Sequence, residues 1–330
     1  MALVAAGKDF LQHLRYQWDL RHSLELKVVL ENEAVRQFDR LKRPVYTVDE
    51  RITGFASVRS LAAFPLPCRF LIAELVAVIS SGYGCVLRRW EVFSRAQTFD
   101  FPHSTLDQHA VITKPFAFDC SELTHETYDG SRIRLGYRIR LRFCARADLS
   151  ERRIEKEIVI LAPRTARRYS PGIFLNAGLE NILHLELELD RRAYHLHDVI
   201  VGRLTFLDNR VMIRRVDIEI RREESGRELS PESELVGSFQ ILEGSPKPGA
   251  VVPIRLFLKQ FSGLTPTCAD GCGIFSVRYV MRLVVIDADL RRFWKEHEIV
   301  LWRASDFLET FLENAVAPCD QTEKEQLLAE

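Results

Sequence analysis

The stretch RIRLGYRIRLRF, residues 132–143, alternates basic and apolar side chains along its whole length. A helix would spread the apolar groups around its circumference, whereas a strand places all of them on one face. The stretch therefore predicts a β-strand with one buried face and one charged face. The apolar positions are Ile133, Leu135, Tyr137, Ile139, Leu141 and Phe143.

The same period of two continues on both sides of this stretch. It is clear in LHLELELD (183–190) and in VDIEIR (216–221). Turn residues such as Asp129-Gly130 and Asp270-Gly271 separate the apolar segments, as is typical of hairpins. Further predicted strands are Leu24–Leu30, Arg51–Val58, Leu71–Ile79, Glu157–Leu161, Val199–Phe206, Val252–Phe257, Phe275–Ile286 and Glu298–Trp302.

Many short strands with few helical crossovers predict an all-β protein made of antiparallel sandwiches. A chain of 330 residues is long enough for two domains of about 150 residues. The segment APRTARRYSPG (162–172) is polar, basic and aperiodic, which is typical of an interdomain linker. We find no internal repeat at the residue level. The predicted parts are an extension with a short helix over 1–23, sandwiches over 24–162 and 177–304, a linker over 163–176 and a tail over 305–330.

The composition is that of an ordinary globular protein. Lys plus Arg and Asp plus Glu each number 46, so no cationic excess favours a nucleic-acid partner. The seven cysteines are scattered, and residues 1–23 lack the pattern of a secretory signal, so we expect free thiols in the cytosol. The most apolar segment, Phe70–Ser80, is too short to span a bilayer, so we expect any membrane association to be peripheral.

Several blocks of the second half, in order and spacing, resemble the family of vacuolar protein sorting-associated protein 26, the arrestin-like subunit of retromer. In the first half the resemblance is carried by HETYDGSRIRLGYRIRLRF (125–143) and KEIVIL (156–161), and it is thin over residues 61–108. The blocks of the second half are GLENILHLELELD (178–190), YHLHDVIVGRLTF (194–206), VMIRRVDIEIRRE (211–223), VPIRLFL (252–258), LTPT (264–267), FSVRYVMRLVVID (275–287) and RRFWKEHEIVLWR (291–303).

The resemblance implies two arrestin-like, immunoglobulin-like β-sandwiches and a subunit that binds proteins without catalysis or a cofactor. It implies that Ile241 and Leu242 project from a loop into the helical-solenoid subunit of retromer. Asp49 and Glu50 lie near a family position that contacts a sorting nexin. The further implied partners are the cytosolic tails of transmembrane cargo, and the implied location is the cytosolic face of endosomes, with indirect membrane contact. A residue-based alternative is that Phe239 and Ile241 share an inward strand face, which would leave only Leu242 free.

Other candidate chemistry has a structural explanation. No glycine-rich phosphate loop, nucleophile elbow or HExxH motif is present. Cys268 and Cys272 lack a second Cys or His pair, so we expect a hairpin with two thiols and no zinc. For His195 and His197 we expect a structural role at the entrance of a strand. The arginines of 132–142 could bind RNA or lipid headgroups, but a solvated face is favoured, with the acidic strands at 183–190 and 216–221 opposite.

Three functional hypotheses stay open. The first is a scaffold subunit of a retromer-like complex that acts in retrograde transport from endosomes. The second is an arrestin-like adaptor outside retromer, or the counterpart subunit of the sister complex, retriever. The third is a hydrolase built on a β-sandwich, which the missing catalytic constellation disfavours.

Overall fold

A computed structural model describes residues 24–61, 65–83, 86–144, 151–163, 170–179, 182–227, 229–261 and 263–304. The chain divides between Ala162 and Pro163 into two compact units. Almost all regular structure is β-strand, with single 3₁₀ turns at Glu33–Val35 and Leu258–Gln260. The predicted helix before residue 24 and the predicted tail over 305–330 lie outside the described residues. In the part of the chain that is described, no helix is long and apolar enough to cross a bilayer.

The first unit is a sandwich of two sheets. The smaller sheet has the order β1-β3-β6, with β1 at Leu24–Leu30, β3 at Arg51–Ser60 and β6 at Val111–Asp119. The larger sheet has the order β2-β9-β8-β4-β5, and β7 pairs with β8. Its strands are β2 (Val45–Thr47), β4 (Leu66–Tyr83), β5 (Val86–Leu106), β7 (Tyr128–Asp129), β8 (Ile133–Cys144) and β9 (Glu151–Leu161).

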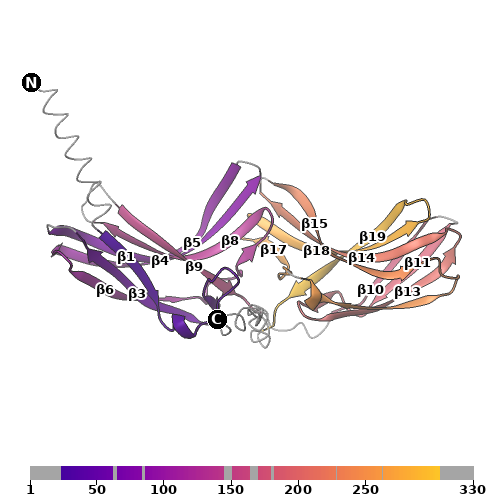
Figure 1. Cartoon of the computed structure of the whole chain (residues 1–330), viewed down its shortest axis with the longest axis horizontal. Coiled ribbons are helices and arrows are strands. Elements are labelled where there is room, and N and C mark those ends of the chain that lie inside the picture. Colours follow the sequence, from indigo (N-terminus) through magenta and orange to yellow (C-terminus); the bar gives the residue numbers. More distant parts are fainter. Residues whose placement is uncertain are drawn as a thin grey trace, which may run out of the picture. The chain divides into compact units, whose positions relative to one another are not determined.

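The second unit also consists of two sheets, which face each other in Figure 1. One has the order β10-β11-β13-β16 and the other the order β12-β19-β18-β14-β15, with β17 paired to β18. The strands are β10 (Ile173–Leu179), β11 (Leu183–Leu189), β12 (Ala193–His195), β13 (Val199–Asn209), β14 (Ile213–Gly226), β15 (Leu229–Glu243), β16 (Val251–Phe257), β17 (Cys268–Gly271), β18 (Phe275–Asp287) and β19 (Arg292–Trp302). β10 begins inside the stretch predicted to be a linker.

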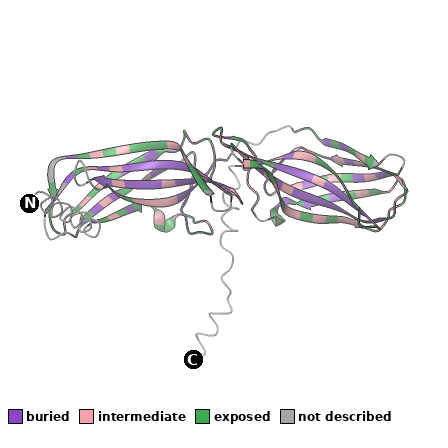
Figure 2. Cartoon of the chain, turned by 90° about the horizontal axis from the view of Figure 1, so that it is seen from above, coloured by how far each residue is buried: buried purple, intermediate pink, exposed green. Residues whose placement is uncertain are grey.

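The core of each unit lies between its sheets, where buried residues alternate along the strands (Figure 2). In β8 all six apolar side chains of the alternating stretch are at most 3% exposed, so the predicted strand is confirmed. The prediction of an all-β fold with two sandwiches is confirmed as well.

We had predicted antiparallel sheets, but two of the sheets also contain one parallel pair each. β2 pairs in parallel with β9, and β12 pairs in parallel with β19, over three residues each. In each unit the chain leaves the smaller sheet, crosses to the larger one and joins its edge beside the strand that ends the unit. Two such distant strands can be parallel because the whole unit serves as their crossover connection.

The two units repeat one topology. Adding ten to each strand number of the first unit gives the pairing of the second, and among the described strands β10 alone has no counterpart. Gly54 pairs with the last residue of β1, and Gly202 pairs with the last residue of β11. Tyr46 and Tyr194 occupy the middle of the short parallel strands, and both are at most 1% exposed. A duplication is therefore present at particular residues, although the sequence shows no repeat.

Candidate functional site

Ile241 and Leu242 directly precede Glu243, the last residue of β15, which is the edge strand of the larger sheet of the second unit. They do not lie in a loop, as the resemblance implied, and both are half-buried. A β-bulge between Val216 and Asp217 leaves Ile241 outside the regular pairing, so that Leu242 lies opposite the fully buried Val216. A bulge interrupts the alternation of faces. Phe239 and Ile241 therefore do not form the regular inward face that we considered as the alternative.

The chain turns directly after this pair. Gly244 has a φ of +87°, a conformation that costs glycine little, and its N–H donates to the carbonyl of Arg214 at 2.8 Å. The turn fixes the end of an edge strand whose outer side has no partner strand among the described residues. Two apolar side chains are thus held at a rigid, accessible border of the second unit.

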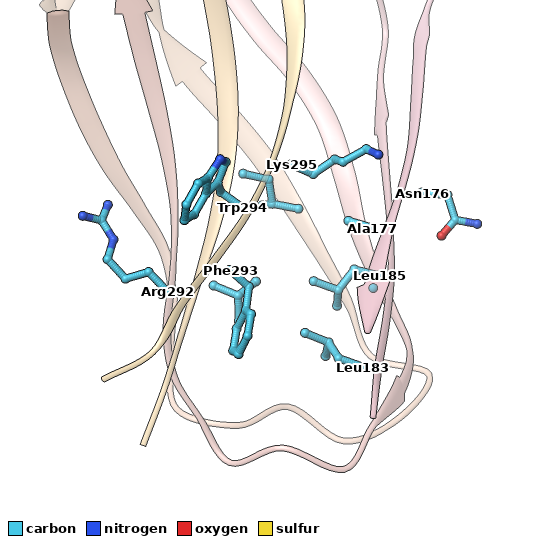
Figure 3. Close-up of a pocket in the computed structure, with 11 residues that line it drawn as sticks. Asn176, Ala177, Leu183, Leu185, Arg292, Phe293, Trp294 and Lys295 are labelled. Atoms are coloured by element: carbon cyan, nitrogen blue, oxygen red, sulfur yellow. The ribbon is translucent and has the colours of Figure 1, made fainter. Parts of the chain in front are cut away.

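A pocket of about 380 Å³ opens between the two sheets of the same unit, at the edge formed by β10 and β19. Leu183 and Leu185 from β11 point toward Phe293 from β19, and Lys295 extends across the mouth toward β10 (Figure 3). The floor is completed by Leu283 and Val285, which are at most 4% exposed. The pocket is apolar inside and polar at its rim, as pockets that select a ligand usually are.

Small residues of β10 create this opening. Ile173 and Leu175 fill the space between the sheets, but the next inward position is Ala177. At the neighbouring Gly178, a Cβ would overlap the backbone oxygen of Leu183, so a larger residue does not fit there. No pocket was predicted here from the sequence. Its only local signal is the small pair Ala177-Gly178 inside an otherwise bulky strand.

The predicted pair Asp49 and Glu50 lies in the turn between β2 and β3. Asp49 is exposed, whereas the Glu50 carboxylate accepts from the Thr47 N–H at 3.1 Å and from Arg36 at 3.1 Å. The Arg36 guanidinium lies 3.8 Å above the ring centroid of Tyr46. Glu50 is therefore engaged in holding its own turn, and only Asp49 is presented to solvent.

The second unit repeats this arrangement. The Asp198 carboxylate accepts from the His195 N–H at 2.8 Å and from Arg191 at 3.3 Å. The Arg191 guanidinium lies 5.2 Å from the ring centroid of Tyr194. An acidic residue three positions after a short buried strand thus caps the turn in both units, which favours a structural explanation for Glu50.

The histidine pair is part of this turn. His195 is 4% exposed, and its ring packs edge-on against Trp302 and His197 at centroid distances of 5.2 and 5.4 Å. Burial lowers the pKa of His195 and that of His197. These contacts favour the expected structural role. Among the described residues, no group of three His, Cys, Asp or Glu side chains could hold a metal ion.

The arginines of β8 are neutralised within the first unit. Arg138 and Arg140 both contact Glu155, at 2.6 and 2.9 Å, and Arg142 contacts Glu74 at 2.5 Å. These acids lie on β9 and β4, beside β8 in the same sheet. The acidic strands at 183–190 and 216–221, which we considered as possible counterparts, belong to the second unit. Because adjacent strands supply the counter-charges, the geometry favours a charged sheet face over an RNA or lipid site.

This ion network predicts acid sensitivity of the first unit. Burial opposes ionisation of Glu155, but hydrogen bonds from Arg138, Arg140 and Arg153 outweigh it and lower its pKa from 4.5 to about 2. A carboxyl with a depressed pKa stabilises the fold above pH 4.5, and this contribution is lost as the pH falls toward 2. We expect the thermal midpoint of the first unit to fall on acidification from about pH 5 to 3. Calorimetry should show a flatter profile for Glu155→Gln, and an equally steep one would contradict this assignment.

Cys268 begins β17, and Cys272 begins the turn at 272–274 that joins β17 to β18 in a hairpin. Cys272 is exposed, Cys268 is half-buried, and neither forms a disulfide. We expect that replacing both by Ser leaves the thermal midpoint nearly unchanged, since no disulfide is removed and Ser is close to Cys in size. Metal analysis and melts of both proteins test this. Stoichiometric zinc, lost in the double variant together with a large fall in midpoint, would overturn it.

Comparison with known proteins gives a consistent result. The model of the vacuolar protein sorting-associated protein 26 family matches residues 20–290, including the stretch 61–108 where the resemblance is thin. The human vacuolar protein sorting-associated protein 26B is 36% identical over 218 residues, which are 64% of this chain and 64% of that protein. The protein from Caenorhabditis elegans is 38% identical over 196 residues, 58% of this chain and 54% of that protein. The Xenopus laevis protein 26B-B is 36% identical over 209 residues, 62% and 61% of the two chains.

The match spans less than two thirds of the length of these relatives. The family model nevertheless covers both units, and most of the blocks that carry the resemblance lie on strands of the two sandwiches. The prediction from the sequence is confirmed: this chain belongs to the vacuolar protein sorting-associated protein 26 family.

Proposed function

We propose that this chain is a non-catalytic scaffold subunit of a retromer-like complex, which sorts transmembrane cargo in retrograde transport from endosomes. Membership of the family supports this role. The observation that carries the proposal is the apolar pair Ile241 and Leu242, half-buried at the end of an edge strand. Apolar side chains held at a rigid border are suited to anchoring a protein partner. In the proposed complex, this partner is the helical-solenoid subunit.

The pocket at β10 and β19 supports a second role of the same unit. β10 pairs only with β11 among the described strands, so its outer backbone groups can pair with an added extended segment. Such a segment could insert an apolar side chain between Leu183, Leu185 and Phe293. We propose that the cytosolic tail of a cargo protein binds here by strand addition.

Filling the pocket is expected to prevent this binding. Ala177→Phe places a ring among the floor residues, and we expect affinity for a cargo-tail peptide to fall about tenfold or more, because one buried apolar side chain contributes about 1.5–3 kcal/mol. Fluorescence polarisation with a labelled tail of a co-purifying cargo receptor measures this. The matched control is Phe174→Ala, on the outer face of the same strand. Equal affinity of Ala177→Phe and wild type would place the cargo site elsewhere.

In the first unit, the exposed Asp49 is the residue that we propose for contact with a sorting nexin. Glu50 would support it indirectly, since its carboxylate orients the turn. Through the nexin the complex would reach the cytosolic face of endosomes as a peripheral assembly.

Affinity purification from cytosol tests the proposal. We expect a long helical-repeat protein to co-purify with the tagged chain in equal amount. Recovery of the sister complex retriever in its place would reassign the chain to that assembly. Recovery of receptor tails alone would favour an adaptor outside both complexes.

A further inference from the structure

Three neighbouring segments at one end of the second unit are joined by hydrogen bonds. The N–H of Ala288 donates to the carbonyl of Met212 at 2.8 Å, and the N–H of Arg210 donates to the carbonyl of Ile182 at 2.8 Å. Ile182 immediately before β11, the turn between β13 and β14, and the turn between β18 and β19 are thereby fixed against one another. This end of the unit is the one where β15 finishes and β14 begins.

Each of these segments exposes a large apolar side chain. Ile182 is 45% exposed, Met212 is 73% exposed and Leu290 is 62% exposed. Single exposed hydrophobic residues are ordinary on a protein surface. Three of them on segments held together by backbone hydrogen bonds form a preorganised apolar surface, which we call the loop-end patch.

Leu290 adds an independent observation. Its φ is +65°, in the left-handed region that disfavours a side chain with a Cβ. The turn is fixed by Asp287, whose buried carboxylate accepts from the Arg291 N–H at 2.9 Å and from the Arg291 guanidinium at 2.7 Å. A leucine that is both backbone-strained and exposed contributes little to the isolated unit. Strain of this kind is concentrated where a residue serves binding.

The loop-end patch is continuous with the contact proposed for Ile241 and Leu242. Ser245, three residues after Leu242, donates its hydroxyl to the carbonyl of Val211 at 3.2 Å, next to Met212. A stable protein interface buries on the order of 800 Å² on each partner, which two half-buried side chains cannot supply. The neighbouring patch offers the apolar surface that such an interface requires.

The charges beside the patch indicate the chemistry of the partner. Arg214 and Lys247 are exposed, and within the described residues neither forms an ion pair. Of the neighbouring acids, Asp208 and Asp289 are paired with Arg210 and Arg291, and Glu243 is exposed, so the cations are in excess. The Arg214 carbonyl accepts from the N–H of Gly244 in the turn after β15, and Lys247 lies two residues after Ser245. Acidic side chains on the partner would complement both.

We propose that the loop-end patch extends the contact with the solenoid subunit by receiving an apolar ridge of a partner helix flanked by acidic side chains. The proposal rests on the function proposed above. It names Ile182, Met212 and Leu290 as binding residues outside the pair Ile241 and Leu242, with Arg214 and Lys247 at the border of the contact.

Leu290→Gly tests the patch without endangering the fold. Glycine tolerates the left-handed conformation, so we expect the thermal midpoint to stay equal or rise while the leucine side chain is lost. Calorimetric titration with the purified solenoid subunit should show affinity reduced about tenfold, and about a hundredfold when Met212→Asp is added. Val35→Asp is the matched control. Val35 is 81% exposed but lies in the first unit, so this variant should bind the solenoid subunit as wild type does. Arg214→Gln with Lys247→Gln should flatten the salt dependence of the association rate.

The outcomes separate this inference from the proposed function. If wild type binds and Ile241→Asp with Leu242→Asn does not, but Leu290→Gly with Met212→Asp binds like wild type, the loop-end patch is overturned and the proposed function stands. If wild type itself does not bind the solenoid subunit, both are overturned. If the association rate of the Arg214→Gln, Lys247→Gln variant depends on salt as that of wild type does, the inference of acidic side chains on the partner helix is wrong.

Discussion

The double substitution Ile241→Asp with Leu242→Asn is expected to abolish binding to the solenoid subunit while both units stay folded. Burying one such side chain at an interface contributes about 1.5–3 kcal/mol. Losing both, and placing a carboxylate in a dry contact, should cost on the order of 4 kcal/mol or more. This corresponds to roughly a thousandfold loss of affinity, which would dissolve a nanomolar complex at cellular concentrations.

Calorimetric titrations of wild type and double variant measure this loss, with thermal melts of the same samples as the control for folding. Ile241→Asp alone is the informative companion, since Ile241 lies outside the regular pairing whereas Leu242 lies opposite buried Val216. Unchanged affinity of the double variant would place the contact elsewhere. A collapsed melt of Ile241→Asp would show that Ile241 belongs to the core.

Gly202→Ala is expected to be the most destabilising single methyl addition in the second unit. A Cβ at Gly202 would overlap the backbone oxygen of Glu188 on β11, and it would lie 2.6 Å from Leu189 Cδ2. A backbone atom of β11, which is paired with a strand on each side, cannot move aside as a side chain can. We expect a loss of about 3 kcal/mol, the upper end of what overpacking usually costs.

Two further glycines make this prediction specific. Gly54 is the counterpart in the first unit, where a Cβ would lie 2.5 Å from the backbone oxygen of Val29, so Gly54→Ala should lower the midpoint of that unit instead. Gly136→Ala is the control, because a Cβ there meets nothing closer than 4.0 Å. Calorimetry should resolve which unit each variant destabilises. If Gly202→Ala melts like Gly136→Ala, the close approach of β13 and β11 is wrong.

Most strands could be predicted because one buried face imposes alternation on the sequence. β1 at Leu24–Leu30 has the predicted bounds, and β8 differs from its prediction by one residue at each end. The long strands that were not predicted are all edge strands: β5 and β15 in the larger sheets, and β6 and β10 in the smaller ones. An edge strand is half-exposed on both faces and, in β15, repeatedly bulged, so its residues carry no regular period.

The candidate site was predictable only in part. The resemblance indicated Ile241 and Leu242 as contact residues but implied that they lie in a loop. Their position on a strand could not be predicted, because the bulge and the turn at Gly244 depend on the pairing of β15 with β14. The role of Glu50 could not be predicted, since its partner Arg36 is distant in sequence and its counterpart Asp198 becomes apparent only when the units are compared. The pocket likewise depends on four strands that meet only in the folded unit.

The most direct test of the scaffold role is sedimentation velocity of the purified chain mixed with the purified solenoid subunit of retromer. We predict a single species with the summed mass of one copy of each protein, persisting at nanomolar concentration. Two separately sedimenting proteins at micromolar concentration would contradict the assignment of this chain as a retromer-like scaffold subunit.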